Sequence, residues 1–526
     1  MLFLLSAGVS AAPSDTLFLK LQQSPQAHVE NLLSVFPADY PAYQLFIQSP
    51  NIRKVIKNHY DMEEFKAITQ QTAETRKLLL TEKPWGTFIK ATSFEDNSIK
   101  SETHYDAIWL RDSLWGYLAL NSQKEDQASA KKVLLTLWDY MSTPAQLERM
   151  DNAISDPSLL NAEDGQMNAV HIRFDSNSAE FNDVLENGKP QQWNHKQNDA
   201  LGLYLASLIQ AIESGQISRS DWEKDYRLSS LIKLVAYLDK IQFYEMADSG
   251  AWEEDARLNT SSIALVTSGL ERLINLLNNK SNSNAVEFKN DLVKSAIKLK
   301  LDQYLKMAQL DNLVNKGYER IRYQLSLGGE SPNYKHDDLH YRKADVALLN
   351  LIYPAKLSRL SLEQKRKILS IVRTLAGSYG IKRYLNDNYQ SANFWFNDIK
   401  TDTSKDSHSK RKEIFIPYTE AQWFFDSWYA TSAAIVYKES HDKYYLSESI
   451  QFMNRSLAQI TGKNMTGANG RPVPAMALPE SMNFLHSSGK LQVLPSPIIP
   501  LNWSKASMTL MFKHLEPVIS DKTNAS

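Results

Sequence analysis

Apolar residues recur at the spacing of an α-helix along most of the chain. Between residues 260 and 278, Val266, Leu270, Leu273 and Leu277 follow one another at intervals of four, three and four, which marks one buried helical face. A second clear helix, with Leu201 on its apolar face, follows residue 199. The same pattern predicts further helices over residues 105–120, 127–140, 227–241, 285–312, 343–352, 362–377, 418–438, 443–461 and 500–513.

Alternating patterns typical of strands are few, and no strand–helix–strand alternation is visible. Glycine and proline separate the helical segments, and no stretch has the composition of a linker. We therefore predict an all-α protein with a single domain over residues 13–526, in which residues 13–100 form an amino-terminal extension. Residues 151–192 lack helical periodicity, and a loop of this length in a compact domain is usually functional.

The composition identifies no function, but it excludes several classes of function. The 526 residues carry a net charge of −1, which gives no electrostatic case for binding nucleic acid or an anionic membrane. The chain has no cysteine, so disulfides, thiolate catalysis and cysteine–zinc sites are excluded. Residues 1–12 form an apolar run that ends in small residues, as at the end of a secretory signal, and they predict a secreted or periplasmic protein.

One stretch concentrates candidate chemistry at the entry to a helix. Trp252, Glu253 and Glu254 lie just before the helix predicted at 260–278. A tryptophan beside a carboxyl removes water from it, and this raises the carboxyl pKa toward the range of a general acid. The alternative is that two acids near a helix N-terminus only interact favourably with the helix dipole.

Three further stretches carry polar groups beside tryptophans or prolines. Residues 109–113 place Arg111 and Asp112 behind a tryptophan, either as a helix-tying ion pair or as paired donors and acceptors for sugar hydroxyls. Trp193 precedes a polar run to residue 199, which also suits a helix N-cap. Glu480 lies in the proline-rich segment 472–481, where it is either exposed at a turn or desolvated.

Taken in order, these stretches resemble glycoside hydrolase family 15, the glucoamylases and their relatives, which include the amylase-like domain of phosphorylase kinase regulatory subunits. The Trp-x-Arg-Asp-Ser motif at 109–113 is similar to the substrate clamp of the family, and Trp193 with residues 197–199 resembles its stacking-tryptophan loop. Residues 252–254 resemble the general-acid loop, Arg383 with Asp387 a sugar-binding loop, and residues 480 and 500–504 the general-base region. The resemblance spans residues 100–515.

The resemblance implies an (α/α)6 barrel with a pocket formed by loops at one end. It implies an inverting hydrolase that releases glucose from α-glucans, with Glu253 as general acid and Glu480 as the base that activates water. The carboxyl groups of inverting pairs lie about 6.5–9.5 Å apart. The substrate-binding residues implied by the family are Arg111, Asp112, Trp193, Trp252, Glu254 and Arg383.

Several departures leave alternatives open. Ser481 follows Glu480 where the family commonly has glutamine, so Glu413 and Glu420 compete for the role of base. His336 and His340 have the spacing of helical metal ligands but no third ligand, and we expect neither a metal nor another cofactor. We expect a monomer. The other functional class is a non-catalytic carbohydrate-binding or regulatory module, which would have no reason to keep both carboxylates.

Overall fold

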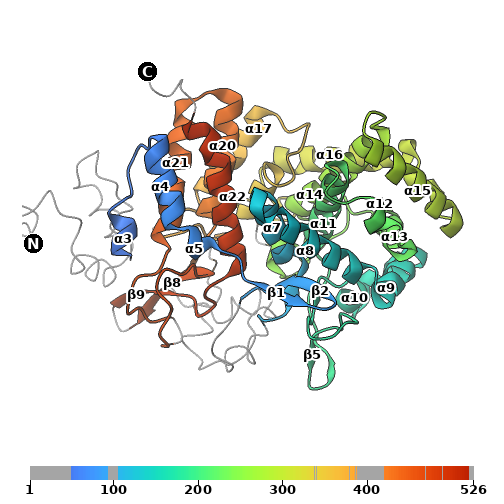
Figure 1. The fold of residues 1–526 in the computed structure, drawn as a ribbon, viewed down its shortest axis with the longest axis horizontal. Coiled ribbons are helices and arrows are strands. Elements are labelled where there is room, and N and C mark those ends of the chain that lie inside the picture. The colour runs from blue at the N-terminus through green and yellow to red at the C-terminus, as the bar shows by residue number, and fades with distance from the viewer. Residues whose placement is uncertain are drawn as a thin grey trace, which may run out of the picture. The chain divides into compact units, whose positions relative to one another are not determined.

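The computed structural model describes residues 49–92, 105–387 and 420–520, apart from residues 337, 339, 378, 386, 468, 469, 488 and 489 (Figure 1). The described residues divide into two compact units. The terminal unit comprises residues 49–77, 373–387 and 420–520, and the central unit comprises residues 78–92 and 105–372. The predicted signal segment 1–12 and the candidate base Glu413 lie outside the described residues.

Long helices make up most of the central unit. They are α7 (Leu110–Asn121), α8 (Gln127–Met141), α9 (Pro144–Ser155), α11 (Asn198–Glu213), α13 (Asp225–Lys240), α14 (Thr260–Asn278), α15 (Ser283–Leu299), α16 (Met307–Leu327) and α17 (Leu362–Arg373). Shorter turns of helix join them, including α10 (Gly165–Asn168), α12 (Arg219–Trp222), η5 (Gly250–Trp252) and η7 (Val346–Leu351).

The central helices fall into two kinds. Helices α7, α11 and α14 are buried on almost every side, whereas α8, α15 and α16 expose one face. A helix buried all round belongs to the interior of a fold, and an amphipathic helix covers it. Helix α7 contacts α11, α11 contacts α14, and α14 contacts η7, so these elements form a continuous inner row.

Helices α11 and α14 cross at unusually close range. A Cβ atom added at Gly202 would lie 2.3 Å from the backbone nitrogen of Val266. One added at Gly269 would lie 3.0 Å from the Cβ of Leu205. Glycine is therefore required at residue 202, because a methyl group there would meet the backbone of the facing helix.

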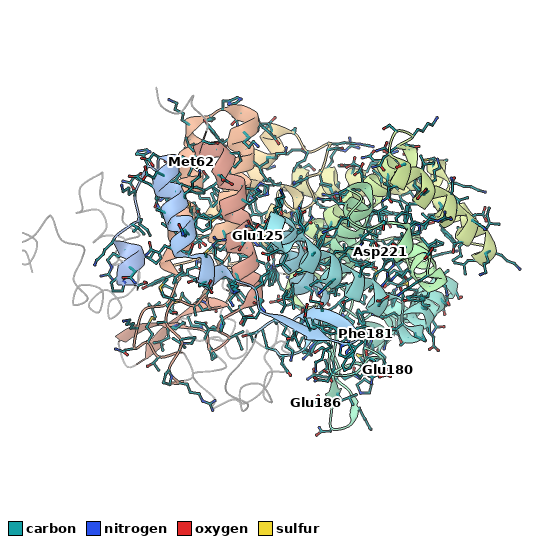
Figure 2. The ribbon with its side chains drawn as sticks, in the orientation of Figure 1. Met62, Glu125, Glu180, Phe181, Glu186 and Asp221 are labelled. Atoms are coloured by element: carbon teal, nitrogen blue, oxygen red, sulfur yellow. The ribbon has the colours of Figure 1, made fainter. Side chains whose placement is uncertain are left out.

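Short antiparallel strand pairs complete the central unit. Strand β1 (Leu80–Lys83) pairs with β2 (Gly86–Ile89), β3 (Ile108–Trp109) with β4 (Arg173–Phe174), and β5 (Leu185–Glu186) with β6 (Lys189–Pro190). Figure 2 labels Glu186 on the projecting β5–β6 hairpin and Phe181 in the loop before it. The Phe181 ring packs against Phe88 and Phe174, which fastens this loop to the core.

The terminal unit contains helices and one sheet. Its helices are α3 (Pro50–Arg53), α4 (Met62–Gln71), α5 (Ala73–Arg76), α20 (Asp426–Ser440), α21 (Lys443–Ala458) and α22 (Asn502–Ile519). Helix α20 contacts both α21 and α22, and α4 and α5 pack on α22. Strands β7 (Glu420–Trp423), β8 (Ser481–Ser487) and β9 (Lys490–Pro495) form an antiparallel sheet with Trp423 opposite Ser481.

The all-α prediction is confirmed, and the helix predicted over 260–278 has those bounds. Several local predictions were wrong. The predicted helix 285–312 is two helices, separated where Lys300 takes a left-handed conformation (φ 59°). The predicted helix 105–120 begins at Leu110 after a strand, and the one over 343–352 is the 3₁₀ segment η7.

Two further errors concern loops and strands. Residues 151–155, predicted as the start of a loop, complete helix α9, which Thr143 caps and Pro144 opens. Residues 420–423 form strand β7 where a helix was expected, and the β8–β9 hairpin was not predicted. Pairing with neighbouring strands decided the structure of these short segments, and such pairing is not visible in local periodicity.

Candidate active site

Glu253 lies at the end of the 3₁₀ turn η5, in a left-handed backbone conformation (φ 58°, ψ 33°). This conformation is uncommon for a residue with a side chain, and it clusters at functional sites. The side chain of Asn194 fixes it, because its Nδ2 donates to the Glu253 carbonyl oxygen at 2.5 Å. A second bond joins the two loops, in which the Ser249 backbone nitrogen donates to the Lys196 carbonyl at 2.7 Å.

The Glu253 carboxyl is largely buried and meets two N–H donors. Its side chain is 13% exposed, and Arg111 Nη2 donates to Oε1 at 3.1 Å. Trp109 also donates a side-chain hydrogen bond to it. Burial raises the pKa of Glu253 above its ordinary value, although the charges of Arg111 and Arg173 and the two hydrogen bonds act in the opposite direction. A carboxyl with a raised pKa is suited to proton donation.

Arg111 is the centre of a buried charge network. Both of its terminal nitrogens donate to Gln197 Oε1, at 2.7 and 2.6 Å, and its Nε lies 3.4 Å from Asp199 Oδ2. Burial lowers the pKa of the guanidinium, but the carboxylates of Asp199, Glu253 and Asp112 outweigh this and raise it overall. The arginine predicted as a clamp therefore holds the start of α11 and the Glu253 loop together.

Asp112 is buried beside this network. Its residue surface is 8% exposed, and burial raises its pKa to about 7, with Glu253 adding to the rise and Arg111 opposing it. The negative charge of Glu253 thus favours the protonated form of Asp112.

Trp193 is buried in the central unit. It is 5% exposed, and its ring meets the Trp109 ring edge-on with centroids 5.9 Å apart. The guanidinium of Arg173 lies 3.8 Å from the Trp193 ring centroid and 4.4 Å from that of Trp109. One face of the Trp193 ring is therefore covered by an arginine.

Trp252 and Glu254 bind a different set of groups from Glu253. The indole nitrogen of Trp252 donates to both carboxylate oxygens of Asp345, at 3.0 and 2.9 Å. Glu254 is 2% exposed and accepts from Arg342 Nη2 at 3.0 Å, while Arg342 also donates to Asp345 at 3.2 Å. The two glutamates therefore differ: Glu253 joins the Arg111 network, and Glu254 joins an ion-pair network that anchors the loop.

Asp248 supports the loop that carries Glu253. It is fully buried and accepts from Asn259 Nδ2, Ser262 Oγ and the Asn198 backbone nitrogen, at 2.8 to 2.9 Å. Burial raises its pKa to about 7, with the charge of Asp199 contributing. These bonds tie the residues before Glu253 to the first turns of α11 and α14, so the loop is held on rigid helices.

Glu480, in the terminal unit, is buried and not exposed at a turn. It is 5% exposed and directly precedes strand β8. Its backbone nitrogen donates to the Ile498 carbonyl at 3.0 Å, and Ser504 Oγ donates to the Pro479 carbonyl at the same distance. The segment before Glu480 is therefore held against the start of α22.

Arg383 and Asp387 pair closely within the terminal unit. Arg383 Nε and Nη2 donate to the two carboxylate oxygens of Asp387, both at 2.8 Å, and Trp423 Nε1 donates to the same carboxylate at 2.9 Å. The guanidinium also lies 4.6 Å from the Trp423 ring centroid. Arg383, predicted to bind sugar, is thus fixed in place by a bidentate pair, which is the strong geometry for arginine.

The two histidines considered as metal ligands have other contacts. His340 Nδ1 lies 2.7 Å from Asp338 Oδ1, and the His336 ring lies against Tyr341 with centroids 4.2 Å apart. Within the described residues, no group of three or more histidine, aspartate or glutamate side chains has the arrangement of a metal site.

Sequence reasoning missed Arg173, Arg342 and Asp345. Arg173 lies in the segment 151–192, where the aperiodic sequence indicated function without indicating a residue. Arg342 and Asp345 lie at the edge of the segment predicted as a helix at 343–352. The sequence carries one signal for Arg173, because this charged residue stands between two apolar ones, Ile172 and Phe174.

The sequence matches the model of glycosyl hydrolases family 15 over residues 65–472, which is most of the chain. The chain belongs to glycosyl hydrolase family 15. It is therefore a glycoside hydrolase, and the matched residues include Glu253 and Arg383.

Two proteins of Escherichia coli (strain K12) are similar to parts of the chain. The uncharacterized lipoprotein YgeQ is 57% identical over 236 residues, which is 45% of this chain and 89% of that protein. The protein YgeP is 50% identical over 103 residues, which is 20% of this chain and 100% of that protein.

Solved structures of glycosidases share the fold. A glycosidase variant with a phenylalanine-to-tyrosine substitution has a TM-score of 0.52 at 14% identity, covering 87% of this chain and 99% of its own. A glycosidase variant in complex with glucose has a TM-score of 0.50 at 14% identity, covering 89% and 99%. The chain therefore has the predicted (α/α)6-barrel fold of these enzymes. None of the helices in the described part of the chain has the length and apolar character required to cross a bilayer.

Proposed function

We propose that this glycoside hydrolase is an exo-acting enzyme that releases glucose from the ends of α-glucans with inversion of configuration. The observation that carries the proposal is the Glu253 carboxyl, which is held in a left-handed turn with a raised pKa and an arginine hydrogen bond. Membership of family 15 supports the same chemistry, and one glycosidase of this fold is solved in complex with glucose.

In this mechanism Glu253 protonates the glycosidic oxygen as the bond breaks. Burial raises its pKa, so the carboxyl holds its proton to a higher pH than an ordinary glutamate, and a general acid typically contributes about 10²–10⁴ in rate. Glu480 is the base that activates a water molecule on the opposite face of the sugar. Because water must fit between the two groups, we expect their carboxyls about 6.5–9.5 Å apart.

The remaining residues bind the substrate. Arg111, Asp112 and Arg383 hold the terminal glucose, Trp193 and Trp252 form walls of the pocket, and Glu254 contacts the adjoining unit. The buried positions of Arg111 and Asp112 support this role, since donors held in a dry site bind sugar hydroxyls without first reorganising. We propose that the enzyme acts as a monomer without a cofactor.

The location that we propose is the cell envelope or the exterior. The apolar segment 1–12 and the similarity to a lipoprotein of Escherichia coli support export. A lipid attached through cysteine cannot be carried by these 526 residues, because they contain no cysteine.

The experiment that tests the function is incubation of the purified protein with starch, glycogen, isomalto-oligosaccharides and trehalose. The expected product is free glucose from the first time point, formed as the β-anomer, which NMR detects before mutarotation. Internal cleavage, seen as oligosaccharides before glucose, would contradict the exo-acting mode. Initial release of the α-anomer would contradict inversion.

A further inference from the structure

Arg173 has no role in the mechanism above, yet it lies beside the acid. Strands β3 and β4 pair so that Arg173 is directly opposite Trp109, and the Leu110 nitrogen donates to the Ile172 carbonyl at 2.8 Å. Arg173 is 2% exposed. A buried arginine needs charge or aromatic partners, because leaving it without them costs free energy.

The partners of Arg173 are aromatic rings and an amide. Its guanidinium lies 3.8 Å from the Trp193 ring centroid and 4.4 Å from that of Trp109, in the corner that the two rings form at 66°. Nη1 donates to the side-chain oxygen of Gln191. A planar guanidinium stacks on aromatic faces, and the compact ammonium of lysine does not reproduce this contact.

The same tryptophan connects Arg173 to Glu253. Trp109 donates a side-chain hydrogen bond to the Glu253 carboxyl, and the positive charge of Arg173 also acts on that carboxyl. A cation against the face of an indole ring attracts its electrons and makes the N–H a stronger donor. Arg111 holds the carboxyl directly, while Arg173 acts through the ring.

We propose that Arg173 is a positioning residue for the general acid, which fixes the Trp109–Trp193 corner and so directs the Trp109 N–H at the Glu253 carboxyl. The inference rests on the proposed role of Glu253 as the acid. It assigns Trp109 and Trp193 a function beyond contact with sugar. Together with Arg173 they form the support that sets the position and the charge environment of the acid.

The test compares Arg173→Met and Arg173→Lys with the parent enzyme in the pH dependence of kcat/KM on an α-glucan. The charge of Arg173 lowers the pKa of Glu253, so its removal raises that pKa. Glu253 then stays protonated to higher pH, and the alkaline limb of the profile of Arg173→Met moves to higher pH. Arg173→Lys keeps the charge, so its limb stays near that of the parent.

Both variants lose the contact of the guanidinium with the two rings, so kcat should fall about 10- to 100-fold in each, as expected for a displaced reacting group. KM should change little, because Arg173 does not touch the substrate. Arg219→Met is the matched control: Arg219 pairs with Asp291 at the surface of the same unit, with a 58% exposed side chain. It should leave kcat and the pH profile unchanged.

A lower melting temperature of Arg173→Met with unchanged kcat and an unmoved alkaline limb would overturn the inference, since a purely structural residue gives that result. If Arg173→Met does not fold, Gln191→Leu removes the anchor of the guanidinium and keeps its charge. That variant should lower kcat with the limb in place, and an unchanged kcat would overturn the inference. An active Glu253→Gln variant would instead refute the proposed function itself.

Discussion

The segments that hold Glu253 and Glu480 are built in different ways. Glu253 follows a strained turn, and its surroundings come from four separate stretches, at Trp109, Arg173, Asn194 and the turn itself. Glu480 directly precedes strand β8, and its backbone nitrogen donates to the Ile498 carbonyl. Two cationic side chains, Arg111 and Arg173, act on the pKa of the Glu253 carboxyl, and the Glu480 backbone is held by that hydrogen bond to the Ile498 carbonyl.

The comparison teaches how a site divides its tasks. A carboxyl in the proposed role of acid needs an environment that balances burial against positive charge, and at Glu253 burial and two arginines act in these opposite directions. A carboxyl in the proposed role of base must face a water molecule, and the hydrogen-bonded backbone before β8 would hold it in position. The largest effects of substitution should therefore come from the two carboxyls, and graded effects should come from the residues around Glu253.

Replacing the acid should have the largest effect. Glu253→Gln should lower kcat on α-glucans by about 10²–10⁴, because an amide cannot donate the proton that the leaving oxygen needs. Steady-state kinetics measure the loss, and circular dichroism checks the fold. Glu319→Gln, an exposed exchange of the same kind on α16, is the control and should keep full activity. More than half of the parent rate in Glu253→Gln would remove Glu253 from the role of acid.

Replacing the proposed base should lower the activity by a comparable amount, but a small nucleophile should restore turnover. Glu480→Ala should lose most activity, and azide should restore turnover by entering the space left by the carboxyl, with a glycosyl azide of inverted configuration as product. Mass spectrometry and NMR identify that product. If Glu480→Ala stays active while Glu420→Ala or Glu413→Ala does not, the role of base belongs to one of those residues.

The clamp should show smaller losses. Arg111→Ala and Asp112→Ala should each lower kcat/KM by about 10- to 150-fold, which corresponds to loss of one charged hydrogen bond. Both kinetics and melting temperature are measured on the same preparations. A helix-tying ion pair would behave in the reverse way, with a lower melting temperature and unchanged constants for the folded fraction.

The smallest expected effect is the dependence of folding stability on pH. Burial raises the pKa of Asp112 and Asp248 to about 7 and that of Glu330 to about 8, all in the central unit. Between the ordinary carboxyl pKa near 4 and these values, the folded state binds more protons than the unfolded state. Stability should therefore fall as the pH rises from about 5 to 8.

Thermal denaturation over that pH range measures the slope. Asp248→Asn removes one of the three buried carboxyls and should make the dependence of melting temperature on pH less steep. Asp151→Asn, at a half-exposed surface ion pair, should leave that dependence unchanged. A melting temperature that rises steadily between pH 5 and 8 would show that the burial of these carboxyls does not govern the pH dependence.

The large helices could be predicted from the sequence because the buried face of a helix such as α14 appears as a regular spacing of apolar residues. The sequence indicated the Glu253 loop as a candidate site because Trp252 and two glutamates lie next to one another before a helix. It could not predict that Glu253 and Glu254 bind different networks, since Arg111 and Arg342 approach from distant parts of the chain. Arg173 was missed for the same reason, because its position opposite Trp109 results from the pairing of β4 with β3.

The close crossing of α11 and α14 links the hydrophobic interior to the chemistry. Both loops that join at Glu253 lead directly into these helices, and Gly202 lies only one turn inside α11. A larger side chain there would separate the helices and, with them, Asn194 from the Glu253 carbonyl. Inactivating substitutions in this protein can therefore arise at a residue that touches neither sugar nor carboxyl, and screening for inhibitors or variants that relies on pocket residues alone would overlook them.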